Sequence, residues 1–284
     1  ILQSIPNLTL YPNYMVVIFG FMFSVIMSKI VMSLPLILDD VIRFFRWLSH
    51  IVSDKTNASS SIGGTPISRL QFLKNTAFGL GALALTTLSY GIIVGRFDFK
   101  KHFVSLGLPT FKSKKPLRIV QISDLHLGSF QKKDKLEEAI ELINNESPDL
   151  IFFTGDLVNN RASEAAPFVE ILSTLKAKYG KYSVLGNHDY ADYIGLDIST
   201  EEGKIAWEAN HQEILSHHKE SGFDLLLNEN RLLNFDGQEI NLVGVENWGG
   251  GRFSKYGDLD VAMQGVKENC PTLLLSHDPT HWQK

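Results

Sequence analysis

Residues of the kinds that bind metal ions follow four short apolar segments of the chain. Asp124 and His126 follow the run 117–123, Asp156 follows 149–154, Asn187 and His188 follow 181–185, and His277 follows 272–276. Each apolar run predicts a buried strand, and the carboxyl ends of strands in an α/β sheet form a ligand crevice. We therefore expect all six side chains to converge in one space.

This combination of side chains suits a two-metal site. Carboxylate, imidazole and amide oxygen together select divalent ions such as Mn²⁺, Fe²⁺ or Zn²⁺. One carboxylate can bridge two ions about 3.5–4 Å apart and so clamp a phosphoryl group. Alternation along an extended chain would place Asp124 and His126 on the same side. Taken alone, Gly155-Asp156 is most often a simple turn, so the prediction rests on all four motifs standing at strand ends in this order.

From about residue 116, apolar runs alternate with charged, amphipathic stretches. The stretches 132–147, 162–178 and about 200–221 predict helices between the strands, and a shorter helix is expected near 259–267. This pattern indicates an α/β domain with buried strands. The histidines at 211, 217 and 218 lie in a polar helical stretch, and we expect them to be solvated.

The first hundred residues have a different composition. The run 14–38 holds Lys29 as its sole charged residue, and 77–95 holds none. A transmembrane helix needs about 20 apolar residues, so both runs predict membrane spans, the alternative being buried helices of a soluble protein. Residues 39–51 predict a short interfacial helix and 53–68 a flexible loop. Basic residues flank both spans, so the positive-inside rule leaves the side of the membrane open.

These observations predict three parts: a membrane anchor with about two transmembrane helices over residues 1–100, a linker at 101–115 and a catalytic domain at 116–284. The expected location is the cell membrane, with the lipid bilayer as a partner. The net charge is −4 and no long basic stripe is present, so no nucleic-acid partner is expected and a nuclease is disfavoured. The single cysteine, Cys270, excludes an internal disulfide.

Four motifs resemble those of the calcineurin-like metallophosphoesterase superfamily. They are Asp-Leu-His at 124–126, Gly-Asp-Leu-Val at 155–158, Gly-Asn-His-Asp at 186–189 and Leu-Ser-His-Asp-Pro at 275–279. The sequences of these motifs are most similar to those of the membrane-associated bacterial branch, which includes exported phosphodiesterases and UDP-diacylglucosamine pyrophosphohydrolase-like members. The resemblance implies a metallophosphoesterase-type β-sandwich flanked by helices. It also implies a metal-dependent hydrolase, with manganese among its metals, that cleaves phosphodiester or pyrophosphate bonds through a metal-bound hydroxide.

The resemblance also implies a role for each matching residue. Asp124 and His126 would bind one ion, Asp156 would bridge both ions, and Asn187 and His277 would bind the other. His188 would lie beside the scissile phosphate, where it stabilises charge or protonates the leaving oxygen. Asp189 would support its loop. Arg252, after the glycine run 249–251, is a candidate contact for a substrate phosphate.

One departure from the family pattern leaves an alternative open. The family completes its metal site with a Gly-His-x-His motif, and no such motif occurs up to Lys284. We do not expect His281 to replace the missing histidines as a metal ligand. We expect the chain to be a fragment of a longer protein that supplies the motif. The alternative is a catalytically inactive membrane-bound sensor or scaffold. As an enzyme, the protein would act on a phosphate ester near the bilayer, with lipid-linked esters as candidates.

Overall fold

The computed structural model describes residues 12–52, 68–108, 111, 115–130, 132–251 and 253–283. They divide into two compact units, Ile1–Lys100 and Lys101–Lys284. Arg252 and most of the loop expected at 53–68 lie outside the described residues.

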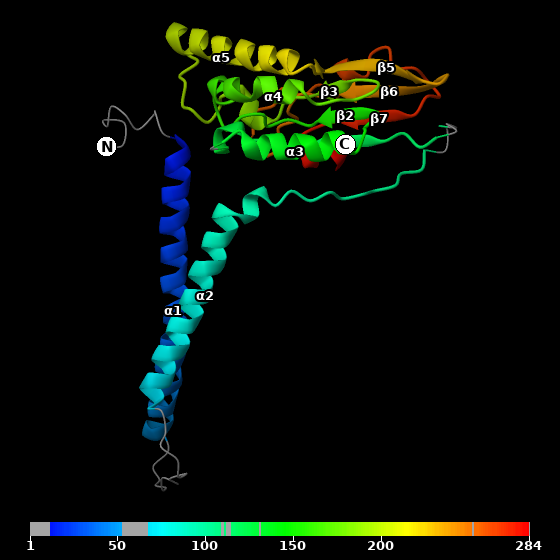
Figure 1. Ribbon diagram of the computed structural model, residues 1–284. Coiled ribbons are helices and arrows are strands. Elements are labelled where there is room, and N and C mark those ends of the chain that lie inside the picture. Colours follow the sequence, from blue (N-terminus) through cyan, green and yellow to red (C-terminus); the bar gives the residue numbers. More distant parts are fainter. Residues whose placement is uncertain are drawn as a thin grey trace. The chain divides into compact units, whose positions relative to one another are not determined.

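Two long helices make up the first unit (Figure 1). These are α1 (Pro12–Val52) and α2 (Arg69–Ile93), followed by the 3-10 turn η3 (Gly95–Phe97). The stretches Val17–Ser49 and Arg69–Phe97 each contain an 18-residue segment with a mean hydropathy of 2.1 and 1.8, respectively, and each stretch is long enough to cross a membrane. The expectation of two membrane-spanning helices is confirmed.

The expected interfacial helix at 39–51 is wrong as a separate element, because these residues continue α1 without a break. Pro35 lies inside α1 and removes one backbone donor, but does not end the helix. Prolines are tolerated in this way in transmembrane helices, where neighbouring groups satisfy the freed carbonyl. At 1.5 Å per residue α1 is about 60 Å long, roughly twice the hydrocarbon thickness of a bilayer.

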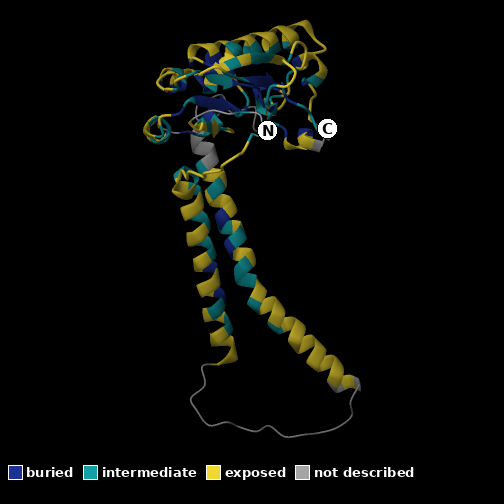
Figure 2. Cartoon of the chain, turned by 90° about the vertical axis from the view of Figure 1, so that its right-hand side faces the viewer, coloured by how far each residue is buried: buried dark blue, intermediate teal, exposed yellow. Residues whose placement is uncertain are grey.

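α1 and α2 pack against each other in antiparallel directions. The Ser28 hydroxyl donates to the carbonyl of Gly81 at 2.7 Å, and Arg69 at the start of α2 pairs with Asp39 late in α1. Gly81 is buried against the side chain of Met32, so its lack of a side chain permits this close approach. Figure 2 shows that most of the remaining surface of both helices is exposed.

The second unit contains two β-sheets. A parallel sheet has the order β1 (Ile119–Ile122), β2 (Leu150–Phe153), β3 (Lys181–Ser183) and β4 (Asp224–Leu225). A mixed sheet holds the antiparallel pair β5 (Glu229–Phe235) and β6 (Gln238–Gly244), with β7 (Thr272–Leu275) parallel to β6. The strands start and end within a few residues of the apolar runs that predicted them.

The two sheets pack face to face around one apolar core. Leu150 and Phe152 of β2 and Leu242 of β6 belong to a single buried cluster, with further members at Val184, Leu226, Phe235, Ile240 and Leu275. All four residues of β2 are buried, as expected of a central parallel strand covered on both faces. The predicted β-sandwich flanked by helices is confirmed.

Helices and 3-10 turns connect the strands. They are η4 (Leu127–Ser129), α3 (Asp134–Asn145), η5 (Ala162–Glu164), η6 (Ala166–Phe168), α4 (Val169–Ser173), η7 (Asn187–Tyr190), α5 (Glu201–Glu220), α6 (Leu259–Ala262) and η8 (Pro279–Gln283). Helix α6 is shorter than expected, and Gly265 follows it in a left-handed conformation with φ of +76°.

The expectation that the α5 histidines are solvated is wrong. His217 and His218 are buried and His211 is half-buried. The ring of His218 stacks on Phe153 of β2 with centroids 5.6 Å apart, and its Nδ1 lies 2.9 Å from the Ser183 hydroxyl. Helix α5 therefore turns His218 towards the sheet, a direction that its polar neighbours in sequence do not indicate.

Candidate active site

The predicted site residues follow the carboxyl ends of four strands from both sheets. Strands β1, β2 and β3 are parallel neighbours, so the loops after them meet at one edge of the sheet. His277 follows β7 of the other sheet, yet its Nε2 lies 3.5 Å from Oδ2 of Asp156 after β2. The fold thus brings together residues separated by more than a hundred positions.

The loops after β1 and β2 have an unusual backbone. Asp124, His126 and Asp156 have φ angles of 54°, 44° and 59°, and Gly155 has 97°. Few non-glycine residues adopt this region, and functional sites hold many of those that do. Backbone hydrogen bonds join the loops, from the Asp124 N–H to Gly155 O at 3.0 Å and from the His126 N–H to Asp156 O at 3.1 Å.

The expected extended geometry at Asp124 and His126 is therefore wrong, although the two side chains do meet. His126 Nε2 lies 3.9 Å from Asp124 Oδ1. Two left-handed residues, and not strand alternation, turn both side chains towards the site. Asp124 is exposed, and its Oδ2 accepts a hydrogen bond of 2.5 Å from the Ser123 hydroxyl.

Asp189 joins the loop after β2 to the loop after β3. Its fully buried carboxylate accepts backbone N–H bonds from Asp156 at 2.9 Å, Leu157 at 2.8 Å and Gly186 at 2.9 Å. Burial raises the pKa of Asp189 to about 7, and the N–H donors act in the opposite direction. The carboxylate supports the loops from behind the site, in the role that the motif implied.

Three histidines of the site share one orientation. Their Nδ1 atoms lie against backbone carbonyls of the loop that begins at the end of β2: His277 at 2.8 Å from Thr154 O, His126 at 3.2 Å from Val158 O, and His188 at 2.5 Å from Asn159 O. A carbonyl only accepts, so each Nδ1 carries a proton, and Nε2 is the ring nitrogen that a neutral imidazole leaves free to bind a cation. Such backbone contacts are the usual way in which proteins orient metal-binding histidines.

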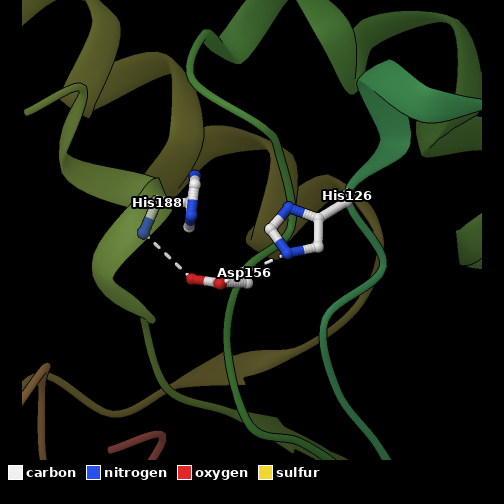
Figure 3. A group of neighbouring side chains, drawn as sticks. All are labelled: His126, Asp156 and His188. Atoms are coloured by element: carbon white, nitrogen blue, oxygen red, sulfur yellow. Dashed lines mark hydrogen bonds and ion pairs between the residues drawn. The ribbon is translucent and has the colours of Figure 1, made fainter. Parts of the chain in front are cut away.

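Two of the Nε2 atoms lie close to the carboxylate of Asp156. His126 Nε2 and His277 Nε2 lie 3.4 Å and 3.5 Å from Asp156 Oδ2, and the His188 backbone N–H donates to Asp156 Oδ1 at 2.9 Å. Figure 3 shows His126 and His188 on either side of this carboxylate. Imidazole nitrogens that surround a carboxylate form a donor set that fits divalent cations.

Two groups of candidate metal ligands share Asp156 among the described residues. One joins His126, Asp156 and His188, and the other joins Asp124, Asp156 and His277, with the ligand atoms of each group within 4.8 Å of one another. The shared carboxylate matches the bridging role implied for Asp156. The grouping differs from the implied pairs, because Asp124 is grouped with His277 and not with His126.

Asn187 contacts Tyr193, a residue that the motifs did not indicate. Its Oδ1 lies 3.2 Å from His277 Nε2, and its Nδ2 donates to the Tyr193 hydroxyl at 2.7 Å. The Tyr193 ring lies 4.5 Å from the His188 ring. Burial raises the pKa of Tyr193, although the bond with Asn187 lowers it, so the hydroxyl is protonated at neutral pH. Its position six residues after Asn187 gives no periodic signal in the sequence.

The glycine-rich segment is attached to the loop after β7. The Gly250 N–H donates to Asp278 Oδ2 at 2.6 Å, and Trp248 stacks on His281 with centroids 4.0 Å apart. His281 is buried with its Nδ1 2.9 Å from the Ser276 hydroxyl, and it belongs to neither group of candidate ligands. A phosphate contact by Arg252 remains a prediction.

Two protein families match the chain. The family described as "Probable Calcineurin-like phosphoesterase, transmembrane domain" matches residues 3–96, and that described as "Calcineurin-like phosphoesterase" matches residues 117–283. The two matches divide the chain in the same order as the long helices and the two-sheet unit.

Curated relatives match more than half of the chain. An uncharacterized metallophosphoesterase of Helicobacter pylori is 30% identical over 169 residues, covering 59% of this chain and 40% of the relative. The UDP-2,3-diacylglucosamine pyrophosphatase LpxG of Chlamydia muridarum is 30% identical over 195 residues, covering 57% of each chain. The match thus spans roughly half of these relatives. Among solved structures, Haemophilus influenzae NAD nucleotidase aligns with a TM-score of 0.37 and 14% identity over 59% of this chain and 35% of that one.

Proposed function

Because the chain belongs to the calcineurin-like phosphoesterase family and carries an N-terminal transmembrane domain, we propose that it is a membrane-anchored hydrolase of phosphate esters that uses two divalent metal ions. The bonds cleaved would be phosphodiester or pyrophosphate bonds. One observation carries the proposal: histidines from three separate loops, each held through Nδ1 by a backbone carbonyl, gather around the carboxylate of Asp156.

In the proposed mechanism each residue keeps the position described above. Asp124, His126, Asn187 and His277 would hold the ions, and Asp156 would contact both. Bound divalent ions supply a Lewis acid for the phosphoryl oxygen and lower the pKa of water to near neutrality. The Asn159 carbonyl keeps the His188 proton on Nδ1, so Nε2 is the atom that can approach a phosphate oxygen. When doubly protonated, His188 can donate from Nε2 to the leaving oxygen.

A lipid-linked phosphodiester or pyrophosphate is the proposed substrate class. Two helices that can cross a membrane hold the chain at the bilayer, where such substrates are concentrated. The Chlamydia relative is named as a pyrophosphatase of a diacylated nucleotide sugar, which belongs to this class. The proposed partners are therefore the bilayer and its lipid phosphates.

The first test is hydrolysis of bis(p-nitrophenyl) phosphate by the full-length protein in detergent with Mn²⁺. We expect activity that EDTA removes, and a loss of about 100-fold or more in Asp156→Asn and His188→Ala. Asp260→Asn and His102→Ala are matched controls, because both residues are exposed. Mn²⁺ binding without hydrolysis of any ester would favour the scaffold alternative.

The second test compares a soluble diester with a lipid pyrophosphate in mixed micelles of the same detergent. The proposal expects a higher kcat/KM for the lipid substrate, and this advantage should shrink as added detergent dilutes the lipid at the micelle surface. Equal kcat/KM for both substrates would contradict the lipid-linked class and leave the hydrolase proposal intact.

A further inference from the structure

Tyr193 lies beside the site but carries none of the proposed ligand atoms. The 3-10 turn η7 ends at Tyr190, and Ala191 follows in a left-handed conformation with φ of 61°. The chain then returns towards the site, so that the Tyr193 hydroxyl accepts a 2.7 Å hydrogen bond from Nδ2 of Asn187. The side chain of Asn187 thus has a partner on each of its two polar atoms.

The hydroxyl of Tyr193 holds the side chain of Asn187 beside His277. In the observed orientation of the amide, Oδ1 lies 3.2 Å from His277 Nε2, on the side where a cation would be shared. A phenol hydroxyl both donates and accepts, so it can bond to either end of the amide and restricts the rotation of the Asn187 side chain as a whole. Because the hydroxyl is bonded to Nδ2, the amide oxygen is the polar atom that remains towards His277.

The ring of Tyr193 also contacts His188. The two rings are tilted by 35° with centroids 4.5 Å apart, and His126 also contacts His188, edge to face at 4.8 Å. Tyr193 is 46% exposed, so it stands at the solvent edge of the site. The imidazole of His188 thus contacts one ring from its own loop and one from the loop after β1.

We propose that Tyr193 is a positioning residue of this site: its hydroxyl holds the Asn187 side chain beside His277 for metal binding, and its ring packs against His188. The inference rests on the proposed function for its catalytic part, while the metal part can be measured without any substrate. The hydroxyl and the ring predict separable defects.

The test measures Mn²⁺ binding to the full-length protein in detergent by the electron paramagnetic resonance signal of free Mn²⁺. In Tyr193→Phe we expect the Kd to rise about 10-fold, the lower end of the effect of losing a partner of a metal ligand. At saturating Mn²⁺ its kcat on a small diester should stay within about twofold of wild type, because the ring remains. An unchanged Kd in Tyr193→Phe would overturn the proposal.

A matched control is Tyr182→Phe, which removes a half-buried hydroxyl from β3, 3.5 Å from the carbonyl of Tyr179. Its Kd for Mn²⁺ should not change. The ring is tested with Tyr193→Leu, which should share the weaker Mn²⁺ binding and also lose kcat by about 10-fold at saturating metal. Equal kcat in the Phe and Leu variants would contradict the role of the ring.

A double-mutant cycle separates positioning from a general loss of structure. If Tyr193 acts through Asn187, adding Tyr193→Phe to Asn187→Ala should weaken Mn²⁺ binding no further. Additive losses would contradict the proposal. A wild-type protein that binds Mn²⁺ but cleaves no phosphate ester would contradict the proposed function alone, because the Kd comparison would still decide the role of the hydroxyl.

Discussion

The two units of this protein place apolar side chains in opposite ways. In the α1–α2 pair, Phe19 and Leu83 are 55% and 65% exposed, while Ser28 is buried between the helices. In the two-sheet unit, Leu150 and Leu242 have no exposed surface. The first arrangement suits a hydrocarbon solvent and the second suits water.

Buried polar groups differ between the units as well. Ser24 and Ser28 are neutral, and both donate to backbone carbonyls, as is required where lipid offers no partner. In the second unit Asp156, Asp189 and His218 are buried and titratable. The comparison teaches that burial of a polar residue does not by itself mark a site in this chain. A buried carboxylate surrounded by imidazole side chains does mark a site, and such a group occurs in the second unit of the described structure.

The largest expected effect comes from replacing one leucine by alanine in each unit. Leu242→Ala should lower the free energy of unfolding of the second unit by about 3 kcal/mol, since it leaves a cavity between the sheets. Leu83→Ala should change the stability in detergent by less than about 0.5 kcal/mol, because its side chain faces outward. Hydrogen exchange at β6 and α2 amides measures both. Similar losses in the two variants would break the comparison.

The next test removes a buried acceptor oxygen. Asp189→Asn should destabilise the second unit by about 2–3 kcal/mol, because one of the three backbone donors described above would then face an amide N–H. Thermal unfolding in EDTA measures this without a contribution from metal. Asp260→Asn, at an exposed position of α6, is the matched control. A midpoint equal to that of the control would show that the second carboxyl oxygen is not needed.

A third test uses pH. Burial, with a smaller contribution from neighbouring His217, lowers the pKa of His218 to about 3. In the unfolded chain this histidine titrates near 6.5, so protons bind the unfolded state first as the pH falls. Between pH 7 and pH 5 the second unit should lose about 2 kcal/mol through this group. His218→Gln should remove that slope, whereas His102→Gln, at an exposed position, should retain it.

The smallest effect concerns the membrane helices. In Gly81→Ala the new methyl group would meet the side chain of Met32, while Gly79→Ala adds a methyl where nothing lies within 4 Å. We expect Gly81→Ala to weaken helix pairing by about 1 kcal/mol and Gly79→Ala to leave it unchanged. Disulfide exchange between cysteines placed at Ser28 and Ala82 can report the pairing. Equal effects would contradict the close packing at Gly81.

Much of the site was predictable because its chemistry lies in short local motifs. A strand that ends in a turn with aspartate, asparagine or histidine indicates both the element and the place of the ligand. The sequence could not show how Asp124 and His126 reach the site, because left-handed backbone in non-glycine residues depends on the hydrogen bonds between the two loops. The burial of His217 and His218 was missed for another reason: their polar neighbours dominate the local pattern of α5.

The sequence by itself determined the two parts of this protein, because hydrophobic periodicity and length are local properties. These parts are a pair of apolar stretches and an α/β domain with polar residues at the ends of its strands. Only the tertiary structure decided which groups aim the ligands. The Thr154, Val158 and Asn159 carbonyls each orient a histidine from another loop, and the Tyr193 hydroxyl contacts Asn187 within the loop after β3. A backbone carbonyl is the same in every residue, so its role as a partner depends on where the folded chain places it and leaves no trace in residue type.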